Sequence, residues 1–384
     1  MKVAIIGTGF LARTRVRCWR RVFGVSIELV VAARDRAKAE AFARAHQLQS
    51  VCTIDELLAD RSVLLVDLCV ANRAHRELCL RAAAAGKHVL CTKPLTVYSG
   101  QDLDERATAA EVATVPRATM LARAVEDAEA MVAACTRAGT QLFYGENWCF
   151  APAIVRAEAL ASASGSAINE MRGWESHSGS HSAYARDWRH TGGGALLRLG
   201  AHPIGTMLWL KQREGERLHG RATRVNTVTA EVRESSDPTQ SGSSVATQPE
   251  SWGACTLKFD DGSVGVAYGS DHMLGGMQSH LTLLGGAFRF ECALSPIDTL
   301  RAYAPRDGVF GNESIMEKVD GHAGWSTPIP DEGWGSGQQG LVQSVAETLS
   351  RGEAAVCDGA LGAEVVRVVY AAYLSAAEGR RIAL

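Results

Sequence analysis

The sequence predicts a two-domain α/β protein in which a doubly wound parallel sheet comes first and an antiparallel or mixed sheet follows. A short apolar run over residues 3–6 leads straight into a glycine-rich turn at the N-terminus. Strand-like and helical segments then alternate through the first third of the chain, which is typical of βαβ units and a parallel sheet. Beyond Gly145 the strand-like segments alternate apolar and polar residues, as strands with one covered face do.

The first domain is expected to cover residues 1–144. Apolar, β-branched runs predict its strands, and runs with helical spacing predict its helices. The expected strands are 3–6, 25–33, 63–70, 88–91 and 141–144, and the expected helices are 36–46, 75–85 and 122–138. Residues 96–120 are polar and alanine-rich and contain Pro116, so we expect an insertion there.

The second domain is expected to cover residues 145–384. Its strands are predicted at 224–232, 252–259, 263–269, 280–284 and 288–292, and a closing helix at 359–377. The turn Asp260-Asp261-Gly262 predicts a hairpin between two of these strands. Residues 234–250 are rich in Ser, Thr, Gln and Pro, and we expect them to form a mobile loop.

Composition narrows the class of protein. The 384 residues are 46% hydrophobic and 21% charged, which is typical of a soluble globular chain. Because 40 basic side chains balance 42 acidic ones, we expect neither a nucleic-acid partner nor a membrane surface. No run approaches the ~18 apolar residues of a membrane span. The ten cysteines lack C-x-x-C spacing, so we expect buried thiols, no metal site and a cytoplasmic location.

The turn Gly7-Thr8-Gly9-Phe10-Leu11-Ala12 carries the pattern G-x-G-x-x-A directly after the first strand. The first glycine permits a tight turn, the second lets backbone N–H groups approach a pyrophosphate, and the small third residue lets helix and strand pack closely. The following helix would point its positive N-terminus at the phosphates. We therefore predict a dinucleotide-binding Rossmann domain with residues 7–11 at the cofactor.

The end of the second strand bears on which dinucleotide binds. An acid there accepts the ribose hydroxyl of NAD, whereas an arginine accommodates the 2′-phosphate of NADP. Here the strand ends Ala33-Arg34-Asp35, and the guanidinium of Arg34 favours NADP. Two alternatives stay open: Asp35 holds the ribose of NAD, or Asp35 is a helix N-cap and Arg34 a solvated side chain.

Several further motifs in order along the chain resemble the glucose–fructose oxidoreductase / inositol dehydrogenase family. They are the third-strand end VANRAH (70–75), AGKHVLCTKPL (85–95), GENWCFAP (145–152), GGGALLRLGAH (192–202) and the tail SAAEGRRI (375–382). The resemblance implies a Rossmann domain followed by an α/β domain whose open, largely antiparallel sheet packs a substrate pocket against the nicotinamide. It places Asn72, His75 and Lys93 at the cofactor. Family members mostly oxidise or reduce a secondary alcohol or carbonyl on sugars, cyclitols and diols, and they commonly form homodimers or homotetramers.

Lys93 matches the lysine of the family's Glu-Lys-Pro motif, which lies beside the substrate hydroxyl. An ammonium there can hydrogen-bond the oxygen as it gains negative charge and can relay a proton. Thr92 replaces the family's glutamate. The simpler interpretation is a surface lysine before a turn proline.

His202 matches the histidine of the family's G-G-G-x-L-x-D-x-G-x-H motif and is the second acid/base candidate, because imidazole titrates near neutrality. Arg198 occupies the position of the family's aspartate, four residues earlier. This change is expected to make His202 less basic, so Lys93 becomes the expected proton donor. Arg198 either binds an anionic substrate or pairs with an acid of the protein.

A polar cluster over residues 175–182 is expected to contribute to the substrate site through His177 and His181. The two histidines are four residues apart, but the intervening glycine and serines indicate a loop, and no third ligand is evident for a metal. Among the residues that begin the second domain, Asn147 is preferred over Tyr144 and Glu146 as a substrate ligand.

The sequence thus predicts an NAD(P)-dependent oxidoreductase acting on a small sugar, cyclitol, diol or hydroxy/keto acid. Two alternatives remain open. One is a cofactor-binding protein with little redox turnover, because two family acids are replaced at Thr92 and Arg198. The other is a tightly bound NAD(P) that is recycled in a non-redox reaction on a glycoside.

Overall fold

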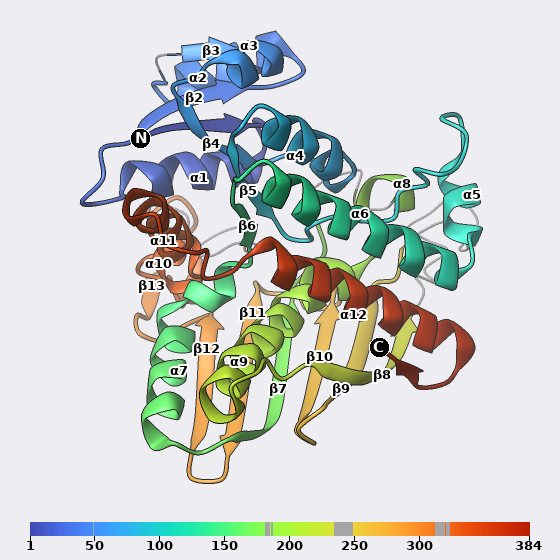
Figure 1. Cartoon of the computed structure of the whole chain (residues 1–384). Helices are drawn as coiled ribbons and strands as arrows, with labels where there is room; N and C mark the ends of the chain where they lie inside the picture. The colour runs from blue at the N-terminus through green and yellow to red at the C-terminus, as the bar shows by residue number, and fades with distance from the viewer. Residues whose placement is uncertain (49, 181–184, 186, 234–248, 312–318, 320–322) are drawn as a thin grey trace.

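The computed structural model describes the chain except residues 49, 181–184, 186, 234–248, 312–318 and 320–322. The described residues form two large sheets with helices around them (Figure 1) and a two-stranded sheet of β13 (Ala302–Ala304) and β14 (Gly324–Ser326). The first is a six-stranded parallel sheet in the order β3-β2-β1-β4-β5-β6, which confirms the predicted Rossmann domain. Its strands are β1 (Lys2–Ile6), β2 (Glu28–Ala32), β3 (Ser50–Cys52), β4 (Val63–Leu68), β5 (His88–Thr92) and β6 (Leu142–Gly145). Its helices are α1 (Phe10–Arg20), α2 (Arg36–Ala45), α3 (Ile54–Ala59), α4 (His75–Ala84), α5 (Ala109–Thr114) and α6 (Arg117–Arg137).

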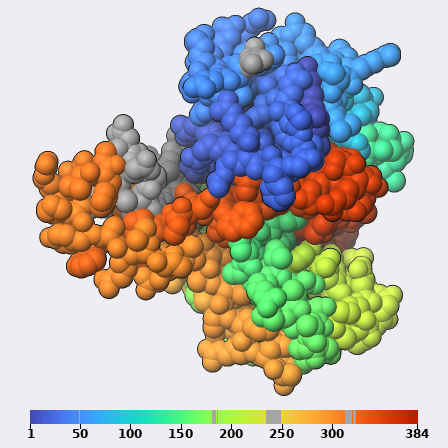
Figure 2. Space-filling model, turned by 90° about the vertical axis from the view of Figure 1, so that its left-hand side faces the viewer, coloured from blue at the N-terminus to red at the C-terminus, as the bar shows by residue number. Residues whose placement is uncertain are grey.

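Alternate residues of each buried strand serve opposite faces of this sheet. On β1, Ala4 and Ile6 pack with α4 and α6, whereas Val3 and Ile5 pack with α1 and α2. The second face is completed by α11 (Gln338–Arg351), which comes from near the C-terminus and lies against α1. Figure 2 likewise shows red C-terminal residues directly beneath the blue N-terminal domain. The two domains therefore share a core.

Part of the expected insertion at 96–120 is helical. Thr108 caps α5 through a reciprocal pair of hydrogen bonds with Glu111. Helix α6 begins at Arg117, directly after Pro116, earlier than the helix predicted from residue 122.

The second sheet has seven strands in the order β12-β11-β7-β10-β9-β8-β15, and only the β7–β10 pair is parallel. The strands are β7 (Ile168–Ser176), β8 (Val225–Arg233), β9 (Trp252–Phe259), β10 (Val264–Ser270), β11 (Gln278–Gly285), β12 (Arg289–Ser295) and β15 (Ile382–Ala383). The predicted hairpin joins β9 to β10, and its turn ends at Gly262. Most of the predicted loop at 234–250 lies outside the described residues, but Glu250 is buried.

Helices cover one face of this sheet and leave much of the other exposed. Helix α7 (Pro152–Ser164) lies by β12, α9 (Ala201–His219) by β7 and β10, and α12 (Gly359–Glu378) by β8. Helix α12 is apolar and long enough to cross a membrane, but most of it is buried in the core. On the exposed face, Trp174 stacks on Tyr268 and His280. The formation of homodimers or homotetramers stays a prediction.

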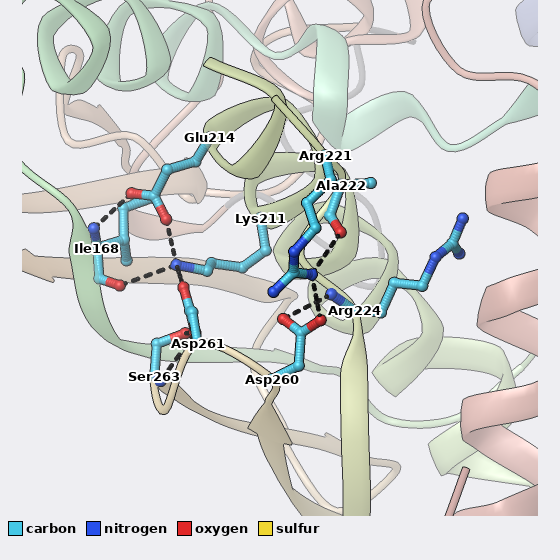
Figure 3. A network of polar contacts seen from close by, with 9 residues as sticks. All are labelled: Ile168, Lys211, Glu214, Arg221, Ala222, Arg224, Asp260, Asp261 and Ser263. Carbon is cyan, nitrogen blue, oxygen red and sulfur yellow. Dashed lines mark hydrogen bonds and ion pairs between the residues drawn. The ribbon is translucent and has the colours of Figure 1, made fainter. Parts of the chain in front are cut away.

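A buried ionic cluster fixes α9 to the second sheet (Figure 3). The Lys211 ammonium is fully buried and pairs with Glu214 and, at 2.7 Å, with Asp261 of the β9–β10 turn. It also donates to the carbonyl of Ile168 at 3.1 Å, and the N–H of Ile168 donates to Glu214 at 2.5 Å. The cluster thus ties the helix to both the start of β7 and the hairpin.

Replacing Lys211 should destabilise the protein strongly. Lys211→Met leaves two carboxylates without their cation, and breaking such a buried pair costs about 3–5 kcal/mol. The matched control is Arg221→Ala, because Arg221 forms an exposed pair with Asp260 next to the cluster and should contribute at most about 1 kcal/mol. Denaturant unfolding of both variants measures the difference, and equal losses would contradict this account.

Candidate active site

A pocket lies where the two domains meet. Leu11 and Thr14 of α1 line it, together with Asn147, Glu175 and His202 of the second domain. It encloses about 710 Å³ of empty space, part of which is open to solvent. The N-terminal end of α1 and the polar residues of the second domain therefore face one continuous hollow, which a cofactor and a substrate could share.

The glycine turn has the geometry that a dinucleotide needs. Gly7 has φ +122°, and a Cβ at that position would lie 2.1 Å from the carbonyl oxygen of Cys69, so no other residue fits. Gly9 caps α1 without any side-chain hydrogen bond, and a Cβ there would meet nothing within 4 Å. Thr8 and Phe10 flank this uncapped helix start, and Leu11 lines the pocket. Residues 7–11 fit a pyrophosphate.

Arg34 and Asp35 follow β2 as predicted. Asp35 is the N-cap of α2, because its side chain accepts from the N–H of Lys38 at 3.2 Å. Arg34 is exposed at the end of the strand. The N-cap alternative for Asp35 is thus confirmed, and this role uses one of its carboxylate oxygens.

His75 holds the main chain next to Lys93 in place. It is fully buried, with Nδ1 3.0 Å from the carbonyl oxygen of Pro94 and Nε2 3.3 Å from that of Val70. Both ring nitrogens face main-chain carbonyls, so His75 fixes the turn after Lys93 rather than presenting a nitrogen to a cofactor. Asn72 donates to the carbonyl of Thr191 at 3.2 Å and links the Rossmann domain to the second domain.

Lys93 and His202 lie close to each other. Lys93 donates a hydrogen bond to the main-chain carbonyl of Arg198, in the turn that leads into α9. His202 is buried near the start of α9, and its ring stacks on Trp148 with 5.6 Å between ring centroids. The positive charge of Lys93 contributes to lowering the pKa of His202. The two predicted acid/base candidates are thus brought together.

The acid that orients His202 is Glu146. Its Oε1 lies 2.6 Å from Nδ1 of His202, and its side chain is fully buried directly after β6. On the other side of the ring, Oε1 of Glu175 lies 3.8 Å from Nε2. His202 therefore has an acidic partner from another element, although Arg198 stands at the motif position of the family's aspartate.

Burial sets the protonation of this pair. It lowers the pKa of His202 well below its usual range and raises the pKa of Glu146, while the charge of Lys93 lowers both. The imidazole is therefore neutral near neutral pH. Nε2 faces Glu175 and the pocket, so it is the atom placed to exchange a proton with a ligand.

The side chain of Arg198 pairs with Asp271, just beyond β10, and both side chains are largely buried. Of the two interpretations left open by the sequence, the structure therefore shows the internal ion pair. His177 is buried, and its Nδ1 accepts from the N–H of Gly179 at 2.9 Å. His181 lies outside the described residues. Asn147 lines the pocket and donates to the carbonyl of Ser336 at 2.6 Å.

Sequence reasoning missed the roles of Glu146 and Glu175. Glu146 was set aside in favour of Asn147, although it directly follows the last Rossmann strand in the segment GENWCFAP. The position of a residue at the carboxyl end of a parallel strand is the signal that could have identified it.

Comparison with known proteins agrees with the fold and the motifs. A family model described as oxidoreductase family, NAD-binding Rossmann fold, matches residues 1–117, and the GFO/IDH/MocA C-terminal domain matches residues 161–290. Together they cover more than half of the chain. The protein belongs to the Gfo/Idh/MocA oxidoreductase family.

Relatives with names match over shorter stretches. A D-apiose dehydrogenase of Paraburkholderia graminis is 31% identical over 163 residues, which is 40% of this chain and 34% of that protein. A 1,5-anhydro-D-fructose reductase of Ensifer adhaerens is 43% identical over 67 residues, 17% of this chain and 20% of that protein. The chain thus matches well under two thirds of the length of these relatives.

Solved structures match over the full length. GenD2 from gentamicin A biosynthesis, in complex with NAD, has a TM-score of 0.80 at 24% identity, with 100% of this chain and 96% of that one covered. Levoglucosan dehydrogenase, in complex with NADH and levoglucosan, has a TM-score of 0.75 at 18% identity, with 100% and 99% covered. At such identities the likeness shows the fold.

The pKa of His202 has a measurable consequence. An exposed imidazole would gain a proton near pH 6.5 and lose its capacity as a base. Because the pKa of His202 is lowered, its ring stays neutral as the pH falls, and we expect the pH profile of kcat/KM to show no inflection at about pH 6.5. An inflection there that His202→Asn removes would contradict this assignment.

Proposed function

We propose that the protein is an NAD(P)-dependent oxidoreductase that moves hydride between the nicotinamide and a secondary alcohol or carbonyl of a neutral, polyhydroxylated small molecule. The observation that carries the proposal is the buried His202–Glu146 pair close to Lys93, because His202 lines a pocket that the uncapped start of α1 also lines. Family membership supports the reaction class, and the sugar and anhydro-sugar enzymes among its relatives support the substrate class.

Each of these residues would have a separate role in the proposed reaction. Residues 7–11 would hold the pyrophosphate, and the bound nicotinamide supplies the hydride chemistry. Lys93, fixed by the carbonyl of Arg198, donates a hydrogen bond to the substrate oxygen and stabilises negative charge on it. Nε2 of His202 takes up the hydroxyl proton during oxidation or returns it during reduction, and Glu146 stabilises the imidazolium that forms.

The Arg198–Asp271 pair bears on the charge of the substrate. Because the charge of the Arg198 guanidinium is already neutralised by Asp271, it attracts a second anion only weakly. The carboxylate of Glu175, which lines the pocket, would repel an anionic substrate. Neutral polyols are therefore preferred to hydroxy or keto acids. Since Glu146 takes the place of the lost acid beside His202, redox turnover is also favoured over a cofactor-binding protein without turnover.

Lys93 and His202 should both be needed for turnover. We expect Lys93→Ala to lower kcat by about 10²-fold or more without changing cofactor affinity. The acidic partner of His202 is present, so His202→Ala should cost at least as much. Steady-state kinetics together with NADPH binding measures both effects, and Lys38→Ala, an exposed lysine on α2, serves as the control. Unchanged kcat in either active-site variant would exclude that residue from the chemistry.

Arg34 should set the choice of cofactor. If its guanidinium holds the 2′-phosphate, NADPH binds more tightly than NADH, and Arg34→Ala weakens NADPH by about 1–3 kcal/mol through loss of charge-assisted hydrogen bonds. NADH affinity should stay the same. Fluorescence titration of both cofactors measures this, and equal wild-type affinities would rule out the preference for NADP.

A further inference from the structure

We propose that Glu175, Ser279 and Ser295 form a hydroxyl-binding row that holds the substrate beyond its reacting carbon. All three residues are buried, and all three line the pocket that contains His202. The inference rests on the proposed function and specifies its substrate class as a neutral polyol with hydroxyls on at least two carbons next to the reacting one.

The row follows from the register of three adjacent strands. Glu175 on β7 lies opposite Ser279 on β11, and Ser279 lies opposite Ser295 on β12. Neighbouring strands are about 4.8 Å apart, so the row extends for roughly 10 Å across the sheet. It begins beside the reaction site, because Oε1 of Glu175 is 3.8 Å from Nε2 of His202.

A β-bulge places Ser295 in the row. On β12, Cys292 and Leu294 face the interior, so regular alternation would turn Ser295 outward. The register instead shifts where Ser279 and His280 pair with Ser295 and Ala293, and Ser295 is only 3% exposed. Bulges beside active sites commonly re-aim a side chain in this way. A local interruption of the ladder thus adds a hydroxyl to the pocket.

The row retains hydrogen-bonding capacity for a ligand. Ser279 donates to Oε2 of Glu175 at 3.3 Å, which orients the carboxylate. The Oγ of Ser295 is buried and makes no hydrogen bond within the part of the chain that the structure describes. Buried hydroxyls are nearly always paired, so an unpaired one lining a pocket indicates a site for a ligand atom.

The chemistry of the row selects its ligand. A carboxylate only accepts hydrogen bonds, and it can accept two from neighbouring hydroxyls, whereas a serine hydroxyl both donates and accepts. Met277 and Leu294 line the same pocket and would contact the C–H face of a ring. Glu175 would repel a carboxylated substrate. A cyclitol or glycoside with adjacent hydroxyls meets these requirements.

The test compares variants of the row with a control on β11, the middle strand of the row. The wild type is first assayed with NADP⁺ and NAD⁺ on neutral cyclitols, methyl glycosides and their monodeoxy analogues. For the best polyol, Ser295→Ala should raise KM about 3- to 10-fold and Glu175→Gln at least about 10-fold, as expected for one neutral and one charge-assisted hydrogen bond. Thr282→Val removes a β11 hydroxyl that donates to Glu291 on β12 instead, and KM should not change.

Monodeoxy substrates separate recognition from mere structural support. The analogue that lacks the hydroxyl bound by Ser295 should have a raised KM in the wild type and be insensitive to Ser295→Ala. Equal effects of Ser295→Ala on the parent and on every analogue would overturn the row while leaving the proposed function intact. Absence of turnover on any polyol would overturn the proposed function and the row together. NADPH binding by the variants, measured by fluorescence, should match the wild type.

Discussion

The hydrogen bond between Glu146 and His202 is the constraint on which the site depends. Glu146 directly follows the last strand of the Rossmann sheet, and His202 lies near the start of α9 in the second domain. Both side chains are buried, so neither can be left without the other at low cost. The pair fixes the imidazole between Trp148 and the pocket, and it ties the segment that follows β6 to the start of α9.

A second buried network ties the Rossmann domain to the C-terminal part of the chain. Arg15 of α1 is fully buried, with its Nε 3.5 Å from Asp67 of β4, and it donates to Gln338 at the start of α11 at 2.9 Å. Trp19 donates to the same aspartate at 2.8 Å. Because α11 also completes the apolar cover of the Rossmann sheet, the C-terminal part of the chain and the cofactor domain are held together as one body. The pocket walls contributed by the two domains are therefore held in fixed relation.

Local patterns in the sequence were sufficient to predict most of the fold. The glycine turn, the alternation of strands and helices and the Asp260-Asp261-Gly262 hairpin all depend on neighbouring residues, and they are confirmed. Helices α3 and α7 were missed although both carry local signals. Thr53 and Glu56 form a capping box at the start of α3, and α7 begins at Pro152 and ends before Gly165.

The site was only partly predictable. Motif positions identified Lys93 and His202, but the partner of His202 is 56 residues away in sequence and that of Arg198 is 73 residues away. No spacing rule predicts such pairs. They form because the start of α9 lies close to the ends of β6 and β10 in the folded chain. The bulge that turns Ser295 inward is likewise a property of strand register and not of composition.

The central claim is that Glu146 and His202 act as one unit, and a double-mutant cycle tests it most directly. Glu146→Gln and His202→Asn are each compared with the double variant by kcat/KM on one neutral polyol. Residues that act as a unit give non-additive losses, so the double variant should lose little more activity than His202→Asn alone. Losses that multiply, with both single variants well folded, would show that Glu146 and His202 contribute independently and would contradict the account.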